Sequence, residues 1–241
     1  MRRSVNNITG YTIQAEDGKI GHLKDLYFDG RMWSIRYFVI DTGNWLPGRQ
    51  VLLTPHVFNN PEWEIKTLPV DLTKKKIEDS PGIEQHKPVS RQLEIELFRY
   101  YGWSPYWICG LQPYAVSVSS PATDEEKPEV DEDPSLRSTE EVIGYKVMAA
   151  DGDIGHVEDF IIEDSNWSIP YLIVDTKNIL PGKKVLISHE WVEEIIWDKR
   201  SIKVGLTREN IKNSPEYNPL VDLDRGYEND LFDYYGKLKT W

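Results

Sequence analysis

The chain has 241 residues, with 28 Lys and Arg against 40 Asp and Glu, which gives a formal charge of -12. Its 39% hydrophobic content supports a folded core, and its acidic balance argues against binding nucleic acid through overall charge. A single cysteine, Cys109, excludes an intramolecular disulfide and a multi-cysteine metal site. Because no run of 18 apolar residues occurs, we predict a soluble, cytoplasmic protein that does not insert into a membrane.

The first hundred residues predict a series of short strands. Strands are expected over residues 11–14, 20–28, 33–41, 50–54 and 62–70, separated by turn sequences. Asp17-Gly18 and Pro47-Gly48 are turn dipeptides, and Gly21 indicates a bulge or bend in the second strand. Antiparallel strands in so short a chain must close or pack to bury their apolar faces, so we predict a small barrel.

Two helices are predicted after these strands. Thr73 is an N-cap candidate for one or two helical turns that end before Ser80-Pro81. Residues 90–102 have apolar side chains at helical spacing, with Ser90 as the cap and Gly102 as the stop. Each strand unit is therefore followed by a short helix and then by an amphipathic helix.

The segment that follows, residues 104–139, begins with an aromatic tail and continues into an acidic, Pro-containing run over 123–134. That run has almost no apolar side chains, so it cannot bury enough surface to offset its ordering entropy. We predict a linker between a first unit at residues 1–103 and a second at residues 140–241.

The second unit repeats the first at a constant offset of 134 residues. Helix-cap and turn residues recur at this offset; Thr73, for example, recurs as Thr207. The repeated motif positions are Asp17 and Asp151, Gly18 and Gly152, Gly21 and Gly155, Asp25 and Asp159, Asp41 and Asp175, Pro47 and Pro181, and Gly48 and Gly182. A gapless repeat of this length predicts two copies of one fold.

These motifs resemble the PRC-barrel domain. The resemblance rests on Asp-Gly-x-Ile-Gly-His-x-x-Asp from Asp17, the strand that ends at Asp41-Thr42, and the Leu-Pro-Gly turn at 46–48, and it covers both repeats. The family is named for the cytoplasmic barrel of the photosynthetic reaction-centre H subunit, and a relative occurs in a ribosome maturation factor. The resemblance implies a mainly β protein with two small PRC-type β-barrels in tandem, related by a pseudo-twofold axis.

The same resemblance implies a docking or assembly module with no common enzymatic activity. We therefore expect a non-enzymatic module whose partners are other proteins or a second copy of itself. Three alternatives stay open: an RNA- or ribosome-associated factor, a reaction-centre-like electron-transfer accessory protein, and a metal-dependent hydrolase. A localised basic face would indicate the first, and converging titratable groups in a pocket would indicate the last.

Histidines and acids recur at the same positions in both repeats. His22 and His156 each precede an acid by three residues, but positions three apart on a strand lie on opposite faces. Asp17 and its copy fit a turn, and the other repeated acids fit strand ends that bind loop amides. Cys109 has no nearby His to activate it. We predict no catalytic residue, no cofactor and no metal.

The aromatic tail is the predicted interaction surface. It comprises Tyr100, Tyr101, Trp103, Tyr106 and Trp107. Tyr and Trp concentrate binding energy at protein interfaces. The alternative is that these rings complete the core of their own repeat or join the two repeats. The run Lys74-Lys75-Lys76 matches Arg208-Glu209-Asn210 in the second copy, so it indicates a solvated helix face.

Overall fold

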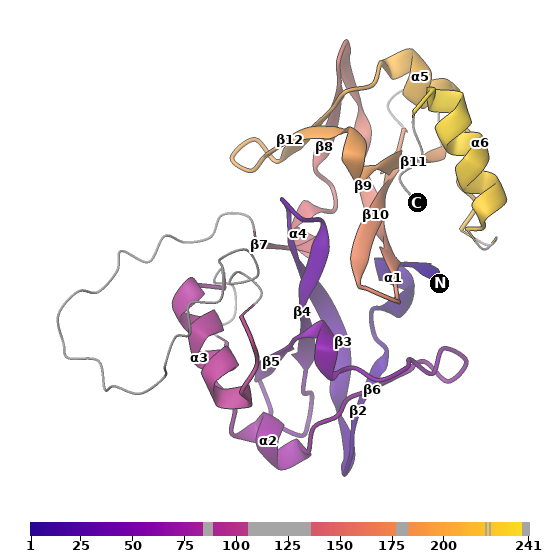
Figure 1. The fold of residues 1–241 in the computed structure, drawn as a ribbon. Coiled ribbons are helices and arrows are strands. Elements are labelled where there is room, and N and C mark those ends of the chain that lie inside the picture. The colour runs from indigo at the N-terminus through magenta and orange to yellow at the C-terminus, as the bar shows by residue number, and fades with distance from the viewer. Residues whose placement is uncertain (84–88, 106–135, 177–182, 220, 222, 238–241) are drawn as a thin grey trace.

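The computed structural model describes residues 1–83, 89–105, 136–176, 183–219, 221 and 223–237 (Figure 1). The first half contains β1 (Arg2–Ser4), α1 (Val5–Ile8), β2 (Thr12–Ala15), β3 (Gly18–Asp29), β4 (Ser34–Asp41), β5 (Gln50–Leu53), the 3₁₀ turn η1 (Pro55–Val57), β6 (Thr67–Pro69), α2 (Lys74–Glu78) and α3 (Arg91–Tyr101). The second half contains β7 (Leu136–Ser138), α4 (Thr139–Val142), β8 (Lys146–Ala149), β9 (Gly152–Glu163), β10 (Ser168–Asp175), β11 (Lys184–Ser188), the turn η3 (His189–Trp191), β12 (Val192–Ile196), β13 (Ser201–Val204), α5 (Arg208–Asn213) and α6 (Arg225–Tyr235).

The two helices predicted after the first strands, α2 and α3, begin and end where the sequence indicates, whereas α1 and α4 were not predicted. The Ser90 side chain accepts a hydrogen bond from the Leu93 N–H at the start of α3, and Gly102 ends the helix in the left-handed conformation with φ 76°. Thr73 and Thr207 cap α2 and α5 in the same way. Within the described residues, no helix is both long and apolar enough to cross a membrane.

The strands of both halves belong to one mixed sheet of thirteen strands. Its main path runs β12-β13-β8-β9-β10-β4-β3-β2-β6, and β1, β5, β7 and β11 pair beside it. The pairs β2·β6 and β8·β13 are parallel. No closed barrel is resolved among the strands described, so the predicted pair of separate barrels is corrected to a single continuous sheet.

The two halves join because β4 and β10 pair at their first residues, Ser34 and Ser168. The Ile35 N–H donates to the Trp167 carbonyl at 2.8 Å, and the reciprocal bond runs from the Ile169 N–H to Trp33 at 2.7 Å. An open strand edge exposes unpaired backbone groups, and each half satisfies those of the other here. The pseudo-twofold relation therefore passes through this contact.

The predicted strand at residues 62–70 is wrong in extent. Only β6 forms as a strand, because Lys66 adopts a positive φ of 54° and the chain reverses there. The Glu62 and Thr67 backbones then exchange hydrogen bonds of 2.8 and 3.1 Å across the turn. In the second half the equivalent segment is the longer hairpin β12–β13, which turns at Arg200 (φ 49°).

The first strand and helix of each half lie on the opposite half. β1 pairs antiparallel with β9, and β7 pairs antiparallel with β3. The helices follow their strands, since α1 contacts β9 and α4 contacts β3. Because β7 lies in the segment predicted as a linker, the last residues of that segment are ordered structure that the sequence analysis did not anticipate.

The core is continuous across this junction. Phe28 and Phe160 contact with ring centroids 5.5 Å apart, and Phe38 meets Trp167 edge-on at 4.7 Å. Buried phenols fix the long helices to the sheet, since Tyr37 donates to Glu94 of α3 and Tyr171 donates to Glu228 of α6. The two halves are thus packed as one unit.

Candidate functional site

The segments β1–α1 and β7–α4, which each pair with the opposite half, are called the exchanged segments. Two buried carboxylates hold them, Asp25 on β3 and Asp159 on β9. Asp25 accepts hydrogen bonds from three donors at the start of α4: Ser138 Oγ at 2.5 Å, Thr139 Oγ1 at 2.8 Å and the Glu140 N–H at 3.2 Å. Asp159 accepts from the Asn6 N–H of α1 at 3.2 Å. Each carboxylate therefore satisfies exposed backbone or hydroxyl donors of the other half.

A bulge in each long strand aims these carboxylates at their partners. The pairing of β3 with β4 shifts between Leu23 and Asp25, and that of β9 with β10 shifts at Asp159. A bulge rotates the side chains that follow it. Strand-end acids are predicted to bind loop amides, but these two bind groups of the opposite repeat.

Burial alters the acidity of Asp159. Removal from water raises its pKa from the ordinary value of 3.8 to about 6, and hydrogen bonds from Phe160 and Asn6 oppose that increase. The exchanged segment is thus attached to a group that titrates in mildly acidic solution.

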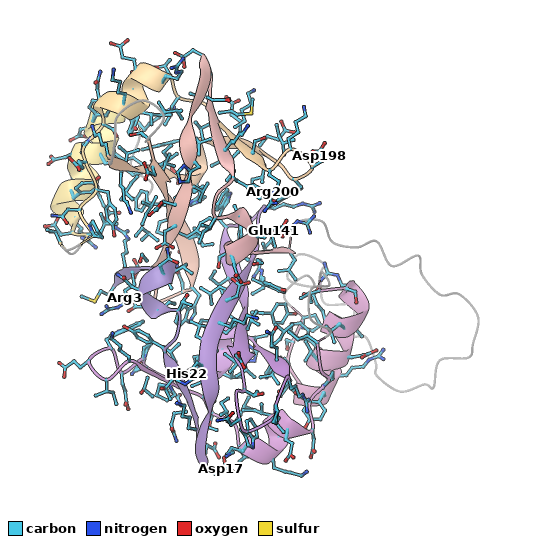
Figure 2. The ribbon with its side chains drawn as sticks, turned by 180° about the vertical axis from the view of Figure 1, so that it is seen from behind. Arg3, Asp17, His22, Glu141, Asp198 and Arg200 are labelled. Atoms are coloured by element: carbon cyan, nitrogen blue, oxygen red, sulfur yellow. The ribbon has the colours of Figure 1, made fainter. Side chains whose placement is uncertain are left out.

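A second candidate site lies at the end of the sheet, where β12 is the terminal strand. β12 pairs with β13 on one side, and no other described strand pairs with it. Asp198 and Arg200 lie in the turn that joins β12 to β13 (Figure 2). A terminal strand offers backbone donors and acceptors to an incoming strand.

A cavity of about 340 Å³ lies beside β12, between the two halves. Trp197 and Ile195 approach Gly30 closely, and a Cβ at Gly30 would lie 3.1 Å from the Trp197 ring. The cavity is lined by Gly30, Arg31 and Trp33 of the first half and by Val192, Glu193, Glu194, Ile195 and Trp197 of the second. Its walls combine apolar rings with the exposed side chains of Glu193, Glu194 and Arg31.

The predicted aromatic surface is partly covered by its own repeat. Tyr101 is buried and stacks on Trp103 with ring centroids 4.0 Å apart. Tyr100 is 36% exposed, and its hydroxyl donates to the Lys76 carbonyl. Tyr106 and Trp107 lie outside the described residues. A partner contact at Tyr100 stays a prediction.

Two repeated acids bind backbone amides in equivalent positions. Asp17 accepts from the Lys74 N–H and Asp151 from the Arg208 N–H, each at 2.7 Å, so each hairpin turn is tied to the first residue of a helix. The exposed Asp41 accepts from the Gly43 N–H at 2.9 Å. The predicted turn glycines Gly18, Gly48 and Gly152 have positive φ. Pro47 lies in a turn. Three other predicted positions lie outside the described part of the chain: Pro181, Gly182 and Cys109.

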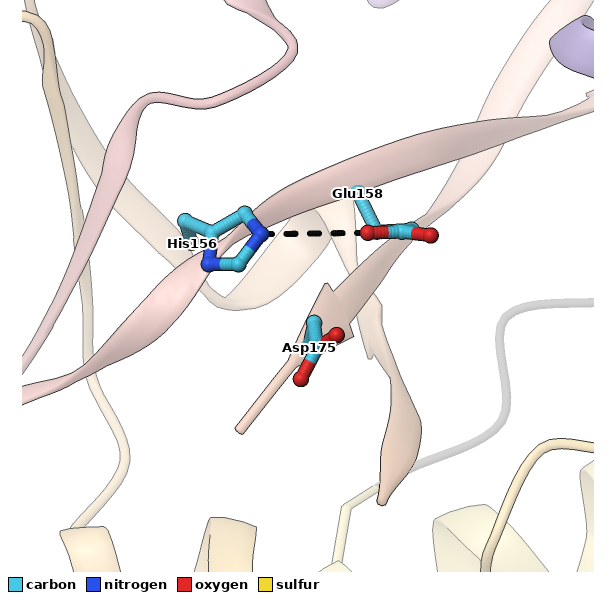
Figure 3. Close-up of side chains that lie close together, drawn as sticks. All are labelled: His156, Glu158 and Asp175. Atoms are coloured by element: carbon cyan, nitrogen blue, oxygen red, sulfur yellow. Dashed lines mark ion pairs between the residues drawn. The ribbon is translucent and has the colours of Figure 1, made fainter. Parts of the chain in front are cut away.

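The middle of β9 and the end of β10 bring together three groups that the sequence pattern does not indicate as a set. A ring nitrogen of His156 and carboxylate oxygens of Glu158 and Asp175 lie within 4.8 Å of one another (Figure 3). Glu158 is not a recurring position, because Lys24 replaces it in the first repeat. Its i+2 spacing from His156 was the available signal.

Comparison with known families assigns part of the chain. Residues 136–210 match the PRC-barrel domain, so this segment, from β7 into α5, is a PRC-barrel domain. The match does not include the first repeat. None of the curated proteins compared with the chain shows significant similarity to it.

Proposed function

We propose that the chain is a non-enzymatic protein-interaction module built from two PRC-type units, and that it binds an extended, basic segment of a protein partner along β12. The observation that carries the proposal is a terminal strand beside a cavity between the halves. The first repeat is taken as a PRC-type unit because its elements match those of residues 136–210 in order, except that β6 alone stands where the second half has β12 and β13.

Strand addition by a partner is supported by the strand pairing within this chain. β3 and β9 each accept a three-residue strand from a distant part of the chain. Main-chain hydrogen bonds supply affinity in such pairing, and pockets for alternate side chains supply specificity. β12 has both features, a terminal edge and an adjoining cavity.

The chemistry beside β12 defines the partner. Glu193 and Glu194 are exposed and outnumber Arg31 in the lining, although Glu193 is already paired with Lys203 Nζ at 2.8 Å. With a charge of -12 on the whole chain, approach of a basic segment is favoured. Trp33, Ile195 and Trp197 line the cavity that a large apolar side chain would enter. An extended segment that alternates basic and large apolar residues meets both requirements.

The test uses the full chain and two labelled peptides of equal length. One alternates Lys with Trp or Ile, and the other replaces each Lys by Glu. Fluorescence anisotropy should show binding of the basic peptide only, with amides of β12 gaining protection from hydrogen exchange. Glu194→Lys should weaken binding by about tenfold, since a rim charge is reversed.

Asp230→Lys is the matched control, because Asp230 is exposed on α6 and is not among the residues that line the cavity. It should leave the affinity unchanged. Equal loss in both variants would indicate general charge attraction and overturn the β12 site. Failure of the basic peptide to bind, or binding of single-stranded RNA in its place, would overturn the proposed function.

A further inference from the structure

We propose that His156, Glu158 and Asp175 form a zinc-binding site in the second half of the chain. His156 and Glu158 stand two residues apart on β9, and Asp175 is the residue of β10 that pairs directly with His156. Figure 3 shows Asp175 below the line that joins the other two side chains. Three possible ligands therefore converge from two adjacent strands, with one ligand atom of each within 4.8 Å of the others.

The backbone holds these strands unusually close at this point. Gly155 has φ 148°, and a Cβ there would lie 2.1 Å from the Asp175 carbonyl oxygen. Only a residue without a side chain permits that approach. The glycine thus allows His156 to lie opposite Asp175.

The donor set favours zinc over a hard cation. One imidazole nitrogen and two carboxylate oxygens are ligands that Zn²⁺ accepts, whereas Mg²⁺ and Ca²⁺ prefer oxygen alone. Bonds of about 2.1 Å at tetrahedral angles place ligand atoms about 3.4 Å apart. His156 Nε2 and Glu158 Oε2 are already 3.7 Å apart, so small side-chain rotations complete the site, with water as a fourth ligand.

Lys184 orients one of the ligands. Its Nζ lies 2.5 Å from Glu158 Oε1, while the other carboxylate oxygen faces His156. Lys184 is the residue of β11 that pairs with Asp175, so three neighbouring strands contribute to the arrangement. Such an outer partner holds a ligating carboxylate in place while leaving its second oxygen for the metal.

The first repeat supplies an internal control. His22 pairs with Asp41 across β3 and β4, as His156 pairs with Asp175, but Lys24 occupies the position of Glu158. A protonated lysine has no lone pair to donate, so the first repeat lacks the third ligand. One zinc per chain is therefore expected, bound by the second half.

The test is calorimetric titration of the full chain with ZnCl₂, repeated with CoCl₂ and followed by visible absorption. Wild type should bind one zinc and give the intense d–d bands of four-coordinate cobalt. His156→Ala and Glu158→Lys should weaken zinc affinity by about 100-fold or more, because even outer partners contribute about 10- to 100-fold. Circular dichroism of each variant checks that it is folded.

His22→Ala is the matched control and should bind zinc as wild type does. MgCl₂ at the same concentration should give no heat of binding. Wild-type affinity in His156→Ala, or an equal loss in His22→Ala and His156→Ala, would overturn the site. Absence of zinc binding by the folded wild-type chain would overturn it as well.

Discussion

Asp159 lies where the first residues of the chain cross onto the second half, and its titration should be visible in the stability of the protein. Its pKa is about 6 in the folded chain against an ordinary value of 3.8, so the folded state binds more protons between these values. Ionisation of this carboxylate therefore lowers the free energy of unfolding as pH rises from about 4 to 6, by up to about 3 kcal/mol.

Asp159→Asn should remove that contribution, since an amide does not titrate. Urea unfolding between pH 4 and 7 should show a smaller loss of stability with rising pH in the variant than in wild type. Asp153→Asn, at an exposed position of β9, controls for the removal of one negative charge. Identical pH profiles for wild type and Asp159→Asn would contradict the assignment.

Gly155 makes a separate prediction at the residue scale. Gly155→Ala would place a methyl group 2.1 Å from the Asp175 carbonyl oxygen, so the strands must separate. We expect a loss of about 3 kcal/mol or more in the free energy of unfolding. Gly144→Ala shares a positive φ but meets nothing within 4 Å, so it should cost only about 1 kcal/mol. Urea unfolding measures both losses. If the two variants lose the same free energy of unfolding, the cost comes from the positive φ alone and not from the contact with Asp175.

At the scale of elements, local patterns predicted most of the strands and helices, but not where their edges pair. β4 and α3 occupy nearly the predicted ranges because Ser90, Gly102 and the aromatic run at 33–41 act through their immediate neighbours. β1 and β7 pair with strands far away in sequence, so no local pattern marks them. Arg3-Ser4 does recur as Arg137-Ser138 at the repeat offset, and that recurrence was the available signal.

The candidate sites were harder to predict than the elements that carry them. Asp25 and Asp159 were recognised as repeated acids, but their partners belong to the other half, which the sequence pattern does not position. The cavity beside β12 depends on the contact of Trp197 with Gly30, two residues separated by most of the chain. A pattern of repeated residues indicates the positions that the two halves share. It does not indicate Glu158, because the first half has Lys24 at that position.

At the scale of the whole molecule, exchange of the first strands makes the two halves depend on each other. The single sheet and the Phe28–Phe160 contact give no boundary at which one half can unfold while the other keeps its core. Heating should therefore produce one calorimetric transition, with the van't Hoff enthalpy equal to the calorimetric enthalpy. Two resolved transitions would show that the halves are independent domains.

A substitution in the first half should then destabilise the second. Asp25→Ala removes the acceptor for two hydroxyls and one backbone N–H at the start of α4, which should lower the free energy of unfolding by about 3 kcal/mol. Asp41→Ala removes one exposed loop hydrogen bond and should cost less than about 1 kcal/mol.

Native-state hydrogen exchange shows whether Asp25 stabilises only its own half or both halves. With Asp25→Ala, the amides of β10 and β11 should lose as much protection as those of β4 and β5. Loss confined to the first half would mean that the exchanged segments attach to folded units without stabilising them.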